Sequence, residues 1–241
     1  MALPDDVEPQ MLDPQVRTEL RSLAKDTSDL VARHLVMTGR LLDEDPTAAL
    51  AHARAARAMA GRVGAVREAA GLAAYHAAEW ADALSELRAA RRITGRADQL
   101  PVLADCERAL GRPEKALAYG DDASVPTLAQ EVKVELVIVL SGARRDLNQN
   151  DAAVLLLQEP ARRTVARRPW AARLWYAYAD ALLAAGREDQ ARTWFAKALE
   201  VDEAGETDAG DRLLQLDGVV LDEPDDDSSD EEPVGAEDPR R

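Results

Sequence analysis

Residues 172–205 constrain the fold more than any other part of the chain, because their apolar residues recur at helical spacing. One face of a first helix is formed by residues at i, i+3, i+4 and i+7: Trp175, Tyr178, Ala179 and Leu182. A second helix has a similar stripe at Ala191, Phe195 and Ala198. Between them lies Gly186, which can end the first helix at positive φ. The stretch therefore predicts a helix hairpin in which the small Ala179 and Ala191 let the two axes approach.

These eight positions place large and small residues as a tetratricopeptide (TPR) unit does, and the stretch strongly resembles that family. Upstream, alanines in the place of Ala191 are found at intervals of 34, 33, 36 and 39 residues, close to the family period: Ala49, Ala83, Ala116 and Ala152. Glu107 stands where an apolar residue is expected, and Pro160 interrupts the fourth unit, which we interpret as an insertion up to Pro169. The resemblance covers roughly residues 30–205 and implies an all-α, right-handed superhelical solenoid of about five hairpins.

Composition supports an all-α fold, since β-branched residues are sparse outside residues 132–139. We expect a flexible N-terminus over residues 1–13 and a helical repeat domain over residues 14–216. The repeat units are expected near 30–63, 64–96, 97–130, 133–166 and 172–205, followed by a capping helix over 207–216. A disordered acidic tail is expected over residues 217–241.

The net charge of −15 is concentrated at the C-terminus. Residues 217–241 contain eleven acidic and two basic residues, whereas residues 1–199 contain 28 acidic and 27 basic residues. A nearly neutral folded part disfavours binding of nucleic acid by the whole surface, because phosphate contacts need an excess of lysine and arginine.

No pattern for catalysis or metal binding stands out in the sequence. The three histidines are dispersed, and HExxH, P-loop and GxSxG motifs are absent. Cys106 is the only cysteine, so no disulfide within the chain is expected. We therefore expect no enzyme activity, no cofactor and no metal. The N-terminus lacks the features of a secretory signal, and no apolar run approaches the ~20 residues of a membrane span, so a cytoplasmic protein without a membrane segment is expected.

The TPR resemblance implies a concave groove, lined mainly by the first helix of each unit, that binds an extended or helical peptide. Among the positions that family geometry assigns to the groove, whose C-terminal half is expected to be basic, the candidate binding residues are eight: Tyr75, His76, Arg108, Arg144, Arg145, Arg173, Tyr176 and Asp180. The lysine and asparagine clamp of chaperone-binding members has no counterpart here, which argues against a chaperone adaptor.

The sequence thus favours a non-enzymatic protein-interaction or scaffold module that binds a protein or peptide ligand. An alternative is an RNA- or ribosome-associated factor, in which an arginine cluster contacts phosphate and the acidic tail limits non-specific binding. That cluster consists of Arg144, Arg145, Arg162, Arg163, Arg167 and Arg168. The same residues are also compatible with a solvent-exposed face that binds nothing. The tail itself could occupy a basic groove, since a tethered segment has a high effective concentration.

Overall fold

The computed structural model describes residues 3–219, and no β-strand occurs in that range. The expectation of an all-α chain is therefore confirmed for these residues. Twelve α-helices follow one another in this part of the chain: α1 Pro14–Leu20, α2 Lys25–Leu41, α3 Pro46–Ala60, α4 Gly64–His76, α5 Trp80–Thr94, α6 Leu100–Ala109, α7 Pro113–Leu117, α8 Gln130–Asp146, α9 Asn150–Arg163, α10 Ala171–Ala184, α11 Glu188–Leu199 and α12 Ala209–Leu216.

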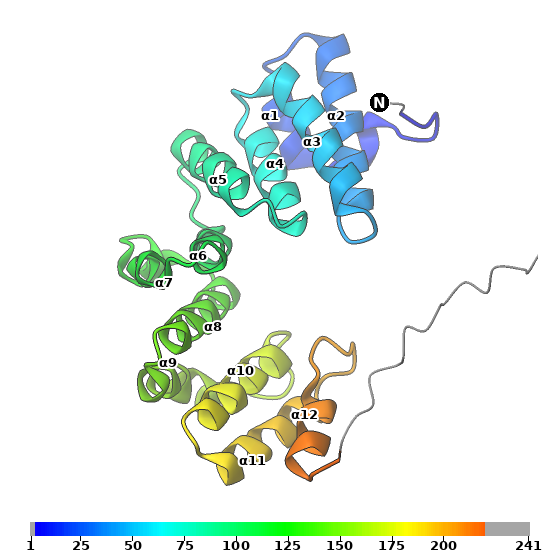
Figure 1. Ribbon diagram of the computed structural model, residues 1–241. Helices are drawn as coiled ribbons and strands as arrows, with labels where there is room; N and C mark the ends of the chain where they lie inside the picture. The colour runs from blue at the N-terminus through cyan, green and yellow to red at the C-terminus, as the bar shows by residue number, and fades with distance from the viewer. Residues whose placement is uncertain (1–2, 220–241) are drawn as a thin grey trace, which may run out of the picture.

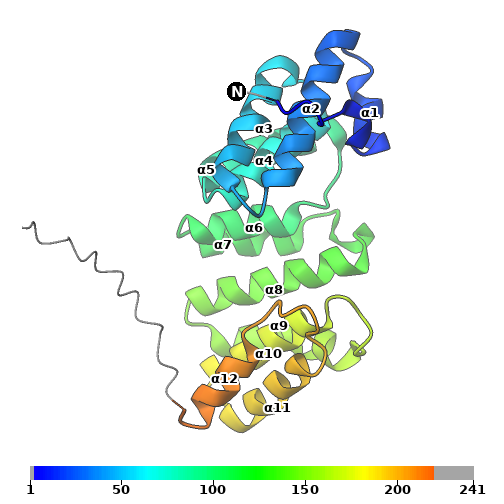
Figure 2. The same ribbon diagram turned by 90° about the vertical axis from the view of Figure 1, so that its right-hand side faces the viewer.

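The helices from α2 to α11 form five consecutive hairpins that stack in a curved array (Figure 1). Each hairpin packs on the next, and the first helices α6, α8 and α10 lie on the inner side of the curve. The view turned by 90° shows the same order of layers along the long axis of the molecule (Figure 2). At the two ends, α1 packs on α2 and α4, and α12 packs on α11. In an inner hairpin the next hairpin covers the apolar face, whereas at the two ends of the array α1 and α12 cover it.

The α10–α11 hairpin packs as the sequence predicts. Ala179, Ala191 and Phe195 are fully buried. The two small alanines let the axes of α10 and α11 approach, and the Phe195 ring fills space in the core beside them. The indole Nε1 of Trp175 donates a hydrogen bond to the carbonyl oxygen of Ala161 in α9, at 3.0 Å. This residue of the repeat pattern therefore also joins α10 to the preceding hairpin.

Four hairpins share one backbone turn between their two helices. The residue that ends the first helix has positive φ in each case: Ala78 (58°), Gly111 (70°), Asn148 (58°) and Gly186 (73°). In each turn the next residue donates its N–H to a carbonyl oxygen five positions earlier, as Arg187 does to Leu182 at 2.9 Å. This is the Schellman arrangement, which gives orphan carbonyls at a helix end a partner.

The fourth hairpin corrects the predicted register by one residue. Ala153 and Leu157 are fully buried, whereas Ala152, which the spacing selects as the anchor, is only half-buried. With Ala153 as the anchor, the positive-φ Asn148 falls at the same repeat position as Gly186. Burial of Leu157 identifies Ala153 as the anchor, whereas the sequence alone does not distinguish Ala153 from Ala152.

Two further details concern the fourth hairpin and the N-terminus. Pro160 lies inside α9, which continues to Arg163 before a connection over residues 164–170 begins. At the N-terminus, most of residues 3–13 are exposed, but Val7 is buried and its carbonyl oxygen accepts a hydrogen bond of 2.8 Å from Arg33 Nε in α2. The predicted tail from residue 220 onward lies outside the described residues.

The core is divided into three apolar clusters along the array, and α8 contributes to two of them through Val134 on one side and Leu136 on the other. Two buried carboxylates connect hairpins: Glu86 pairs with Arg57 and Arg67, and Glu107 pairs with Arg88. Within residues 3–219, no helix is both long and apolar enough to cross a membrane.

Candidate functional site

A pocket of about 370 Å³ lies on the inner side of the array, where α6, α8 and α10 meet the segment before α12. Five of the eight predicted groove residues line it together, although they are spread over more than seventy positions of the chain: Arg108, Arg145, Arg173, Tyr176 and Asp180. These five residues, which the TPR resemblance assigns to the groove, therefore lie around one pocket.

Helix α8 forms the centre of this pocket with a stripe of four residues at i, i+3, i+4 and i+7: Ile138, Ser141, Gly142 and Arg145. Gly142 is small because Arg108 of α6 crosses over it. A Cβ atom at this position would lie 2.4 Å from the Arg108 guanidinium carbon. The glycine thus lets an arginine from one hairpin extend across the first helix of the next.

The connection between α11 and α12 forms one wall of the pocket, through Glu206, Thr207 and Asp208. Asp202 holds this connection in place, because its carboxylate accepts hydrogen bonds from the backbone N–H groups of Glu206 and Thr207, at 2.7 and 2.8 Å. A hydrogen bond from the Thr207 hydroxyl is the main cause that lowers the pKa of Asp202, and the two backbone hydrogen bonds lower it further. Sequence reasoning missed this wall because the connection lies outside the repeat pattern.

Tyr176 of α10 lines the pocket and is hydrogen-bonded to Asp208 of this wall. Burial raises the pKa of Tyr176, and its hydrogen bond to Asp208 raises it further, so the phenol stays protonated. The ring also packs edge-to-face against Phe195, with centroids 5.3 Å apart. Together with Ile138 and Ala177 it provides the apolar part of the pocket lining.

The pocket is not basic, because its arginines are paired with carboxylates of the protein. Arg108 Nε lies 2.8 Å from Asp146, Arg173 Nη2 lies 2.5 Å from Glu135, and Arg145 pairs with Asp180. The lining contains three arginines and three carboxylates in all. The predicted excess of positive charge in this half of the groove is therefore wrong for this pocket, since the neutralising acids come from other helices.

The other three predicted groove residues do not line this pocket. The hydroxyl of Tyr75 in α4 donates to Asp105 of α6 at 2.7 Å, which joins two neighbouring first helices. His76 ends α4 and lies 3.5 Å from Asp43. Arg144 donates a hydrogen bond of 2.6 Å to Gln149 beyond the end of α8.

The predicted arginine cluster is divided between the two ends of one hairpin. Arg144 and Arg145 are in the last turn of α8, whereas Arg162 and Arg163 are in the last turn of α9. Because α8 and α9 are successive helices of a hairpin, these last turns lie at opposite ends. Arg167 and Arg168 follow in the connection to α10. The six side chains do not form one continuous surface.

Cys106 is buried, and burial raises the pKa of its thiol to about 12, so it stays protonated at neutral pH. Among residues 3–219, no three His, Cys, Asp or Glu side chains are grouped so that they could hold a metal ion.

Comparison of the sequence with models of known protein families and with curated proteins finds no match. The similarity to TPR units accordingly rests on the residues and spacings of the chain itself.

Proposed function

We propose that this protein is a non-enzymatic interaction module of the TPR type, a right-handed superhelix that binds an extended peptide segment of a partner protein along α6, α8 and α10. The observation that carries the proposal is the pocket to which three first helices each contribute predicted groove residues. Its volume is in the range of about 300–1,000 Å³ that is usual for ligand sites.

The lining favours a peptide with little net charge. Every arginine of the pocket has a carboxylate partner, so a strongly acidic ligand would have to displace an existing ion pair. Ile138, Ala177 and the ring of Tyr176 offer apolar contact, whereas Ser141 and Thr207 offer hydroxyl groups. A small apolar side chain flanked by main-chain amides matches these groups best.

The experiment is selection of peptides from a random display library on the whole chain, followed by affinity measurements with two variants. Ala177→Arg fills the pocket and should weaken the selected peptides at least about tenfold. Leu155→Arg introduces the same side chain at an exposed position of α9 outside the pocket and should leave affinity unchanged. Equal affinity for wild type and Ala177→Arg would refute the proposal.

RNA binding is the competing hypothesis. The divided arginines give no continuous basic surface for a phosphate backbone, so we do not propose it as the function. Titration with single-stranded RNA separates the two cases, because binding through several phosphates weakens steeply between about 0.05 and 0.2 M salt.

A further inference from the structure

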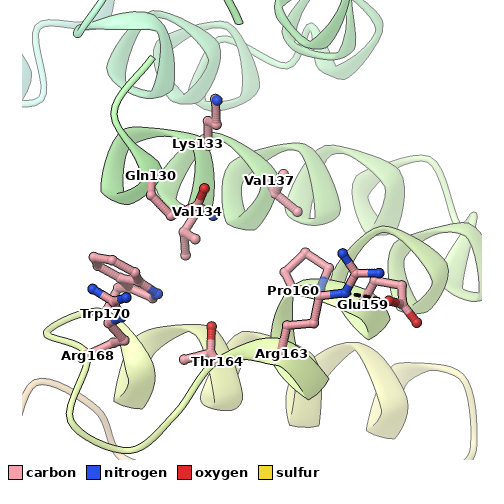
Figure 3. A pocket seen from close by; sticks show the side chains of 10 residues that line it. All are labelled: Gln130, Lys133, Val134, Val137, Glu159, Pro160, Arg163, Thr164, Arg168 and Trp170. Atoms are coloured by element: carbon pink, nitrogen blue, oxygen red, sulfur yellow. Dashed lines mark ion pairs between the residues drawn. The ribbon is translucent and has the colours of Figure 1, made fainter. Parts of the chain in front are cut away.

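A second pocket, of about 380 Å³, lies between the first two turns of α8, the last turn of α9 and the connection over residues 164–170 (Figure 3). Val134 and Val137 of α8 and Pro160 of α9 form an apolar part of its lining. Figure 3 shows Trp170 on one side of the space and Arg163 on the other. The predicted insertion in the fourth unit thus forms one wall of this pocket.

The rim of this pocket is basic, unlike that of the first. Its charged residues are Lys133, Arg163 and Arg168 against the single carboxylate of Glu159. Glu159 pairs with Arg163 at 3.0 Å. Within residues 3–219, Lys133 and Arg168 form no ion pair: the ammonium donates to the carbonyl oxygen of Pro126 at 2.8 Å, and the guanidinium lies 5.3 Å from the centre of the Trp170 ring. The rim therefore favours an anion.

The indole of Trp170 adds a donor without an acceptor. The residue is only 8% exposed, and its Nε1 has no hydrogen-bond partner among the described residues. Figure 3 shows this nitrogen turned toward the space between Val134 and Thr164. The nearby Trp175 differs, because its Nε1 donates a hydrogen bond to the carbonyl oxygen of Ala161. A buried N–H without an acceptor is unfavourable, and a ligand oxygen would remove that cost.

We propose that this pocket binds carboxylates of an acidic peptide segment, and that the segment is the chain's own C-terminus, residues 220–241. Ten carboxylates against two arginines make the segment complementary in charge to the rim. Carboxylate oxygens accept hydrogen bonds from guanidinium, ammonium and indole N–H groups alike. Val234, between two acidic pairs, supplies an aliphatic side chain for the apolar part of the lining.

The segment is long enough to reach the pocket from its point of attachment. Val219 follows α12, whose Arg212 pairs with Asp180 in the second half of α10, whereas Trp170 immediately precedes α10. Helix α10 is about 21 Å long, and twenty-two residues extend over as much as roughly 70 Å. Attachment to the same chain gives the segment a local concentration on the order of millimolar. This inference does not depend on the proposed function, because the two pockets are separate.

Zero-length carbodiimide cross-linking of the full-length native protein tests the proposal, because this reagent joins lysine amines to carboxylates in direct contact. The chain has only four lysines, at positions 25, 115, 133 and 197. Lys133 is half-buried and the other three are exposed, so random encounters favour the other three. We expect most cross-links from residues 220–241 to join Lys133, as identified by mass spectrometry.

Two matched pairs of substitutions test the role of the pocket. Arg163→Glu with Arg168→Glu reverses two rim charges and should reduce the Lys133 cross-links at least about tenfold. Arg162→Glu with Arg167→Glu changes the net charge by the same amount at neighbouring residues that do not line the pocket, and should change them less than about twofold. Trp170→Phe keeps an aromatic ring but removes the indole N–H donor, and it should reduce the Lys133 cross-links as well.

The proposal is overturned if the cross-links are spread over the exposed lysines, if they favour Lys197, or if both arginine pairs have equal effects. A mixture of isotope-labelled and unlabelled protein shows whether the contact lies within one chain. Cross-links that join labelled to unlabelled chains as often as chains of the same kind would also overturn it.

Discussion

His34 of α2 and His52 of α3 face each other inside the first hairpin, with their Nδ1 atoms 2.9 Å apart. Both side chains are buried. One Nδ1 must donate a hydrogen bond and the other must accept it, so at least one ring is neutral and protonation of both rings breaks the contact. Burial lowers the pKa of both histidines, and the neighbouring His52 lowers that of His34 further.

Acidification should therefore destabilise this hairpin. The folded-state pKa values lie below the ordinary value of 6.5, so the unfolded chain binds protons first as the pH falls. The stabilisation is complete above that value and is lost as the pH falls toward the folded pKa values; each unit of depression is worth about 1.4 kcal/mol. We expect a lower melting temperature at pH 5.5 than at pH 7.5.

The control is the double variant His34→Leu with His52→Leu, which keeps His76 and every carboxylate. Its melting temperature should change much less over the same interval. An equal acid shift in both proteins would assign the effect to other groups.

Glu107 is a second buried polar residue, at a repeat position where the last unit has Leu182. Its carboxylate accepts a hydrogen bond of 2.5 Å from Arg88, while Arg112 lies 3.6 Å away and Oε2 has no hydrogen-bond partner. Buried ion pairs of this kind often contribute less than an apolar residue of similar size, yet removal of one partner is costly.

The two ends of this ion pair should consequently respond differently to substitution. Arg88→Ala leaves the buried carboxylate poorly compensated and should lower the free energy of unfolding by about 2 kcal/mol, less than for a fully buried pair because Arg112 remains. Glu107→Leu restores the apolar stripe and releases a half-exposed arginine to solvent, so it should be neutral or stabilising by about 1 kcal/mol. Urea denaturation measures both. The reverse order of stabilities would contradict this interpretation.

At the scale of the element, the hairpins repeat one backbone turn with different residues. Gly111 and Gly186 adopt positive φ at little cost, but Ala78 adopts the same conformation with a Cβ atom. Asn148 is intermediate, since asparagine tolerates the left-handed region better than most residues.

Glycine should therefore stabilise the second hairpin more than the fourth. We expect Ala78→Gly to raise the free energy of unfolding by about 1 kcal/mol and Asn148→Gly to raise it by less. Ala77→Gly, one residue earlier where φ is −82°, is the control and should be destabilising. Thermal denaturation of the three variants decides the order; a loss of stability in Ala78→Gly would contradict the role of this turn.

The sequence predicts these elements as far as local chemistry determines them. Spacing and glycine locate the hairpin over residues 172–205, because stripe, turn and small residues agree there. In the fourth unit, Ala152 and Ala153 are equally good anchors locally, and burial of Leu157 against other helices selects the second. Pro160 does not end the helix, since α9 continues through it for three more residues.

At the scale of the whole molecule, ion pairs join the first helices along the inner side of the array. One series of contacts runs from Tyr75 through Asp105 and Arg108 to Asp146, and so links α4, α6 and α8. A second series runs from Arg145 through Asp180 to Arg212 and links α8, α10 and α12. Residues expected to recognise a ligand therefore also join hairpins.

This dual role explains how far the candidate site could be predicted. Repeat positions assign Arg108, Arg145 and Arg173 to the inner side, because the helical period sets the direction of a side chain. Asp105 pairs with Arg108 within α6, at i and i+3, whereas the other carboxylates that neutralise these arginines belong to other helices or to the α11–α12 connection. No local pattern reports the contacts between different elements, so the charge of the groove could be inferred only in part from its own residues.

The most direct test of the account is photo-cross-linking in a native lysate with p-benzoylphenylalanine placed at one of two positions of the full chain. At position 177 the photoreactive group lies in the pocket of α6, α8 and α10; at position 155 it lies on an exposed face of α9. We predict that a partner protein is cross-linked from position 177 and not from position 155. Cross-linking of the same partner only from position 155, or equally from both, would contradict the assignment of the inner side as the binding surface.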